Sequence, residues 1–126
     1  MGGVTYDTGA LVAAERNDRR MWALHAAFLA EEVVPVVPAP VLAEAWRGAR
    51  QASLARALAA CDVEELGEDQ ARHVGTLAGR AAHDDIVDVT VVEGALRRSH
   101  AVVTLNADHI RLIAEAAGKR PRIEAV

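Results

Sequence analysis

Short apolar runs alternate along the whole chain with stretches that are long enough to form helices. Four of these runs predict strands, at residues 4–6, 33–37, 63–66 and 101–105, and a weaker fifth lies at residues 122–126. Helices are expected between them at residues 11–15, 20–32, 40–46, 51–60, 68–82 and 84–99, with a last one after Asn106. Strict alternation of strand and helix favours a parallel sheet with helices on both faces.

Two of these helices are predicted from different sequence features. In residues 20–32, Trp22, Ala26 and Leu29 recur at spacings of four and three residues and predict one buried face. Residues 84–99 are rich in β-branched side chains and could also form a strand. A helix is favoured because Asp84 or Asp85 can cap it and because the next apolar run already supplies the following strand.

Length and charge limit the class of protein. The 126 residues suffice for a single domain spanning residues 1–126, and Cys61 is the only cysteine, which rules out an intramolecular disulfide. No signal peptide or membrane-spanning run is recognisable, so a cytoplasmic protein is expected. The net charge of −4 argues against wrapping of duplex DNA by bulk electrostatics but is compatible with an acidic nuclease pocket.

Carboxylates follow the expected strands at one edge of the sheet. Asp7 comes directly after the first strand, and Glu44 lies on the helix that follows the second. Asp85 and Asp88 are three residues apart, so they share a helix face, where two like charges need a positive partner. In open parallel sheets ligands bind outside the carboxyl ends of the strands. These four acids therefore predict one pocket.

The polar residues after the fourth strand extend this edge. They are Thr104, Asn106 and Asp108. Oxygen ligands without a cysteine pair or paired histidines suit Mg²⁺ or Mn²⁺ better than zinc. Such ions support hydrolysis at phosphorus, by activating water and by stabilising the leaving oxygen.

Each acid also has a purely structural interpretation. Helix capping could be the sole role of Asp7 and of Asp85, and Asp84 competes with Asp85 for the second cap. The sole role of Asp108 could be a favourable interaction with the dipole of the last helix. Glu44 could be a solvated helix residue. The five histidines are His25, His73, His83, His100 and His109, and they share no spacing. Most are expected at the surface or at helix caps. Only His83 and His109 lie near the predicted pocket.

Four blocks in this order resemble the PIN domain, and within it the VapC-type toxins of bacterial toxin–antitoxin pairs. They are VTYDTGALVAAE with Asp7 and Thr8, VPAPVLAEAWRG with Glu44, HDDIVDVTVVEGAL with Asp85 and Asp88, and AVVTLNADHIRLI with Thr104, Asn106 and Asp108. The resemblance covers nearly the whole chain. It implies a three-layer α/β/α sandwich with a central, mainly parallel sheet of four to five strands. It also implies a Mg²⁺- or Mn²⁺-dependent endoribonuclease, a homodimer, and a small antitoxin protein that covers the pocket.

The chain departs from the family pattern at Asn106, where an aspartate is usual. Asn106 could supply a neutral oxygen ligand, Asp108 could take part, or a second metal could bind weakly. The departure also keeps open a catalytically inactive PIN-like module that acts through protein–protein binding. A phosphohydrolase with an aspartyl nucleophile would need a second aspartate at position 9, which is Gly9, and a receiver domain would need a lysine better placed than Lys119.

Arginines near the pocket are candidates for contacts with RNA. Arg47, Arg50 and Arg56 follow Glu44 closely and could bind phosphates or simply form a solvated basic surface. Thr8 and Thr104 are further candidates for substrate binding. Arg97 and Arg98 are expected to interact favourably with the dipole at a helix C-terminus.

Overall fold

The computed structural model describes residues 2–126, which contain one five-stranded parallel sheet. The strands are β1 (Val4–Tyr6), β2 (Val36–Pro38), β3 (Asp62–Glu64), β4 (Ala101–Thr104) and β5 (Ile123–Ala125), in the order β3-β2-β1-β4-β5. The expected parallel α/β architecture is confirmed. β2 begins at Val36, later than expected, after a left-handed residue at Glu32 (φ 62°) and the exposed Val34.

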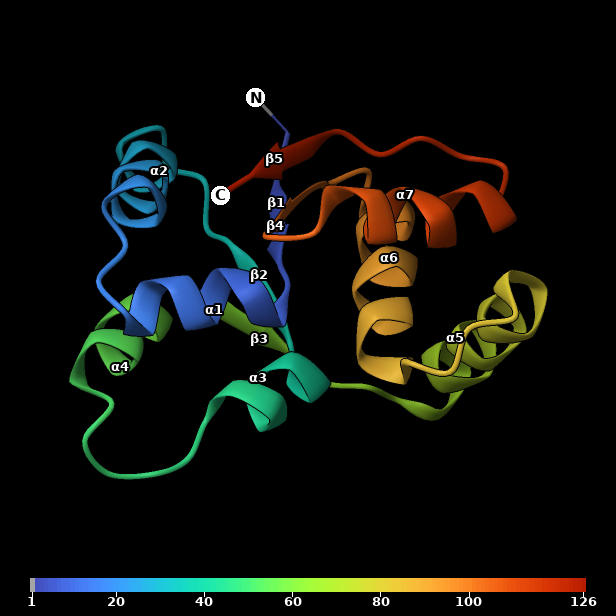
Figure 1. Cartoon of the computed structure of the whole chain (residues 1–126), viewed down its shortest axis with the longest axis horizontal. Coiled ribbons are helices and arrows are strands. Elements are labelled where there is room, and N and C mark those ends of the chain that lie inside the picture. The colour runs from blue at the N-terminus through green and yellow to red at the C-terminus, as the bar shows by residue number, and fades with distance from the viewer. Residues whose placement is uncertain (1) are drawn as a thin grey trace.

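Seven helices connect the strands of the described chain. They are α1 (Thr8–Glu15), α2 (Arg19–Ala30), α3 (Ala39–Ala45), α4 (Ala52–Leu58), α5 (Glu68–Ala81), α6 (Ile86–Arg98) and α7 (Ala107–Ala116). Figure 1 shows α1, α2 and α4 on one side of the sheet and α5, α6 and α7 on the other. The predicted three-layer α/β/α arrangement is therefore present, and the strand order places β1 at its centre.

Valine and alanine dominate the core between the layers. β1 and β4 are buried along their whole length, and α6 buries Val89, Val91, Val92 and Ala95. Small side chains allow the helices to lie close to the sheet. Among the described residues, no helix combines the length and the apolar composition that crossing a membrane requires.

The buried face of α2 differs from the expected one. Met21, His25 and Phe28 face the core, whereas Ala26 and Leu29 are exposed and Trp22 is half-buried. The helix is turned by one residue because His25 reaches the buried hydroxyl of Tyr6, at 2.8 Å from Nδ1. Trp22 instead donates its indole N–H to the Ala14 carbonyl at the rim. His25 is an exception to the expectation that the histidines lie mostly at surfaces or caps.

Residues 86–98 are helical, as predicted, despite their β-branched side chains. Asp85, and not Asp84, provides the N-cap of α6, since its carboxylate accepts a hydrogen bond from the Asp88 N–H at 3.2 Å. The helix ends at Ser99, which has a left-handed backbone. Burial of six residues of α6 against the sheet and the neighbouring helices outweighs the β propensity of the segment.

Arg97 and Arg98 lie in the last turn of α6, as expected, and they also contact carboxylates. Both guanidinium groups bind Glu64 at the end of β3, and Arg97 also binds Glu93. Arg98 reaches the hydroxyl of Thr5 as well. Burial by itself would raise the pKa of Glu64, but the hydrogen bonds and charges of the two arginines lower it below its ordinary value.

Candidate metal centre

Asp7 lies where β1 ends, at the carboxyl edge of the sheet. Its side chain is almost fully buried and caps α1 by accepting a hydrogen bond from the Ala10 N–H at 2.9 Å. Burial is the main cause that raises the pKa of Asp7, and the charge of Glu44 adds to it, while hydrogen bonds from Thr104 and from backbone N–H groups oppose the rise. Asp7 is thus both a helix cap and a carboxylate held at the edge.

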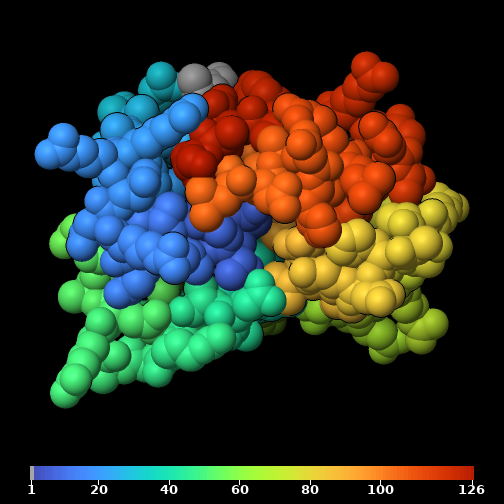
Figure 2. All heavy atoms as spheres, in the orientation of Figure 1, coloured from blue at the N-terminus to red at the C-terminus, as the bar shows by residue number. Residues whose placement is uncertain are grey.

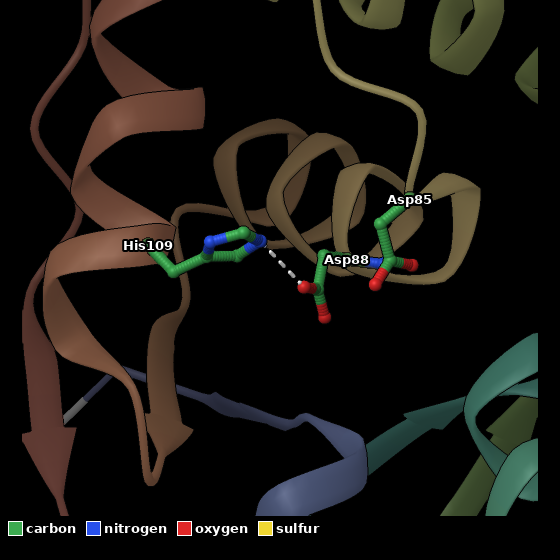
Figure 3. A group of neighbouring side chains, drawn as sticks. All are labelled: Asp85, Asp88 and His109. Carbon is green, nitrogen blue, oxygen red and sulfur yellow. Dashed lines mark hydrogen bonds and ion pairs between the residues drawn. The ribbon is translucent and has the colours of Figure 1, made fainter.

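The first turn of α6 brings Asp85 and Asp88 to the same edge (Figure 3). The pKa of Asp88 is raised to about 6, mainly by burial and additionally by the charges of Asp85 and Asp7, while the charge of His109 opposes the rise. These couplings show that Asp7, Asp85 and Asp88 share one electrostatic environment. Like charges gathered in this way disfavour ionisation unless a cation lies between them.

His109, on the first turn of α7, joins the carboxylates. Its Nε2 lies 2.9 Å from an oxygen of Asp88, and Figure 3 shows the imidazole directed from α7 toward α6. One ligand atom each from Asp85, Asp88 and His109 lie within 4.8 Å of one another. His83 packs edge-on against His109, with ring centroids 4.5 Å apart, and its Nδ1 accepts the Asp85 N–H.

The sequence placed His109 near the pocket but not among its ligands. The signal that could have identified it is its position three residues after the helix cap Asn106, on the turn that begins at the carboxyl edge. Spacing along the chain could not show that α7 turns this side chain toward α6. The contact depends on how the two helices pack against each other.

The remaining predicted ligands lie outside this group. Glu44 is on the exposed side of α3 and reaches the site through its charge on Asp7. The Asn106 side chain accepts the His109 N–H, so it caps α7. The side chain of Asp108 is 99% exposed and pairs with Arg111. Asn106 therefore stands beside the centre, and Asp108 faces solvent.

The threonines predicted to contact substrate lie at the pocket and differ in their hydrogen bonding. Thr104 is fully buried, where its oxygen accepts the Asn106 N–H at 2.9 Å and its side chain bonds Asp7. The hydroxyl of Thr8 is buried without a hydrogen-bond partner among the described residues. An unsatisfied hydroxyl beside Asp7 is costly unless a ligand bonds to it.

Two of the three predicted arginines make contacts within the described chain. Arg47 donates to the carbonyls of Ala43 and Trp46 at the end of α3. Arg56 lies over the Trp22 ring, 4.6 Å from its centroid. Arg50 is exposed in the loop after α3, at a φ of 73°. Of the three, Arg50 is the one whose guanidinium group makes no hydrogen bond, ion pair or ring contact with the described residues.

The residues of this edge fit a divalent cation. Two carboxylates and an imidazole converge within ligand distance, a third carboxylate adds charge, and the Thr8 hydroxyl lacks a partner. A cation would relieve the repulsion that raises the pKa of Asp88. The sequence indicated a set of oxygen ligands, and the imidazole of His109 adds a nitrogen ligand to it. A mixed set of this kind suits Mn²⁺ and other transition metals better than Mg²⁺.

Solved structures share this arrangement of strands and helices. A chain of the VapBC2 complex from Rickettsia felis, determined bound to a DNA fragment from its promoter, aligns over 97% of both chains with a TM-score of 0.72 and 13% identity. The 126-residue protein itself therefore has a PIN-like fold. PAE2754 from Pyrobaculum aerophilum aligns with the PIN-like domain over 97% of its length and 83% of that chain, with a TM-score of 0.65 and 15% identity. No protein-family model and no curated protein matches the sequence.

Proposed function

We propose that this PIN-like domain is a Mg²⁺- or Mn²⁺-dependent endoribonuclease that hydrolyses RNA phosphodiester bonds. The observation that carries the proposal is the gathering of Asp7, Asp85, Asp88 and His109 at the carboxyl edge of the sheet. Such an edge is where parallel α/β proteins bind their ligands. Glu44, whose charge acts on Asp7, completes the acidic rim.

A divalent ion bound there would act as a Lewis acid toward a phosphodiester and would help to activate water for attack at phosphorus. Asp85 and Asp88 would hold the ion, because with a pKa of about 6 Asp88 is mostly ionised at neutral pH. Thr104 and the backbone of α1 fix the Asp7 carboxylate in place.

The biological role follows the same proposal. The domain would act in the cytoplasm as the toxin of a type II toxin–antitoxin pair, as a homodimer held inactive by a small cognate antitoxin. The structural likeness to a chain of the VapBC2 complex supports this role. Asn106 and Asp108 would then influence a second metal only indirectly, from the cap of α7 and from solvent.

The decisive experiment compares RNA cleavage by the wild type and by Asp88→Asn in Mg²⁺ or Mn²⁺. Loss of a ligand carboxylate should reduce the cleavage rate by at least about 100-fold, since even residues that only support metal ligands commonly cost 10–100-fold. Asp69→Asn is the matched control, because Asp69 is exposed on α5, away from the centre. Undiminished cleavage by the Asp88 variant refutes the assignment.

The second candidate is an inactive PIN-like module that acts through protein binding. The engagement of Asn106 as a helix cap and the exposure of Glu44 favour it, because neither side chain joins the ligand group. Cleavage by the wild type in Mg²⁺ or Mn²⁺ that stops in excess chelator would exclude this candidate. Equal RNA integrity under both conditions would support it.

A further inference from the structure

Positive charge is concentrated where α7 meets β5, in the segment Lys119–Arg120–Pro121–Arg122, here called the basic loop. All three of its cationic residues are exposed. Among the described residues their side chains make neither an ion pair nor a hydrogen bond. Arg97 and Arg98 behave differently, because Glu64 binds both. The basic loop therefore carries uncompensated charge on a chain whose net charge is −4.

The surface around this loop is hollowed. One hollow of about 240 Å³ lies between α7 and the loop and is lined by Arg111, Lys119 and Arg120. A second of about 400 Å³ lies between the loop and the end of α6, where Arg122 replaces Arg111. Glu115 is the single carboxylate among the described residues that line the two hollows. Concave surfaces with guanidinium groups suit phosphate, which accepts their parallel N–H donors.

α7 links this surface to the candidate metal centre. His109 lies on its first turn at the centre, Arg111 follows two residues later at the first hollow, and the basic loop begins just beyond the end of the helix. A helix of ten residues is about 15 Å long. Figure 1 shows α7 running outward from the sheet before the chain returns to β5. In Figure 2 the orange and red surface of this part of the chain adjoins the yellow surface of α5 and α6.

We infer that the basic loop and Arg111 bind the phosphate backbone of RNA along α7, toward the end of this helix that lies away from the candidate centre, an inference that rests on the proposed function. The RNA strand would run along α7, with successive phosphates meeting Arg111, Lys119, Arg120 and Arg122. These contacts position the strand and carry no sequence information. An acidic protein segment could also meet this charge, but the continuity with the centre along α7 favours the substrate.

The test measures binding of a labelled single-stranded oligoribonucleotide in excess chelator, over a range of salt concentrations. Each phosphate contact on a single strand contributes about 0.7 to the slope of log affinity against log salt. The triple variant Lys119→Ala/Arg120→Ala/Arg122→Ala should therefore lower the slope by about 2 and weaken binding without regard to sequence. The matched control is Arg16→Ala/Arg19→Ala/Arg20→Ala, which removes the same charge from exposed positions around the start of α2.

Failure of this inference is distinguishable from failure of the proposed function. Metal-dependent cleavage does not occur in chelator, so a protein without nuclease activity can pass, and a nuclease can fail. A slope that changes by less than about 0.7, or changes equally in the control, overturns the inference. So does the absence of RNA binding by the wild type. Loss of affinity for polyglutamate with unchanged affinity for RNA would assign the basic loop to an acidic protein partner.

Discussion

Asp88 carries a charge that most of its surroundings oppose. Burial and the carboxylates of Asp85 and Asp7 raise its pKa to about 6, and only His109 favours its ionised form. A carboxylate with a raised pKa destabilises the folded state wherever it is forced to ionise. The energetic cost of this residue is explained if its task is to bind a cation.

Replacement of Asp88 by asparagine should stabilise the metal-free protein at neutral pH. Because the pKa rises from 3.8 to about 6, the folded state binds more protons than the unfolded state between these values, so wild-type stability falls as pH rises. The penalty is complete above about pH 6. It is smaller than the about 3 kcal/mol that about 1.4 kcal/mol for each pH unit gives, because solvent screens the partly exposed side chain. Urea unfolding in chelator from pH 4 to pH 8 measures the difference between variant and wild type.

That difference should be close to zero near pH 4 and should grow toward pH 6. Asp69→Asn, on exposed α5, should show no such dependence. A stability difference that is the same at every pH would contradict the raised pKa.

The C-terminal turn of α6 is tied to the edge strand β3 by charge. Glu64 binds both Arg97 and Arg98, and the Arg98 side chain is 15% exposed. The sequence placed Glu64 at a strand and the arginines at a helix end, but it could not pair residues 33 and 34 positions apart. Helix packing across the sheet decided that contact.

Glu64→Gln should destabilise the protein by about 2 kcal/mol, because it leaves a largely buried guanidinium without its counter-ion. The loss should be smaller than the about 3–5 kcal/mol of a fully buried pair, since Glu64 is partly exposed. The lowered pKa of Glu64 gives its stabilising effect a pH dependence: it is present above the unfolded pKa and is lost as pH falls through the folded one. Chemical denaturation at pH 7 and at pH 3 measures both.

Glu68→Gln is the control for this element. Its pair with Arg72 lies on the surface of α5, with both side chains more than three-quarters exposed. Loss of such a pair should cost less than about 1 kcal/mol. Equal losses in the two variants would show that the Glu64 contacts do not connect α6 to β3.

At the scale of the whole molecule, the candidate centre joins parts of the chain that are far apart in sequence. Asp7 follows β1, Asp85 and Asp88 begin α6, and His109 begins α7. An ion bound by all of them would resist separation of the central strand from two helices. Metal binding and global stability should therefore be coupled.

Mn²⁺ at 100 times its dissociation constant should raise the free energy of unfolding by about 3 kcal/mol. His109→Asn should reduce this increment more for Mn²⁺ than for Mg²⁺, because the imidazole nitrogen contributes more to transition-metal binding than to Mg²⁺ binding. Thermal unfolding with each ion, corrected for unfolding in chelator, measures the increments. Identical losses for the two ions would exclude the imidazole as a ligand.

The sequence alone determined the alternation of strand and helix, and hence the parallel sheet, because these depend on local periodicity and on burial of apolar runs. It also predicted Asp7, Asp85 and Asp88 in one pocket, from the position of Asp7 after a strand of the parallel sheet and from the three-residue spacing of the other two acids on a helix. Only the tertiary structure turned α2 to bury His25, directed His109 toward Asp88, sent Asp108 into solvent and paired Glu64 with Arg98. These outcomes depend on the rotation and packing of helices, which residues distant in the chain fix together and which no local pattern specifies.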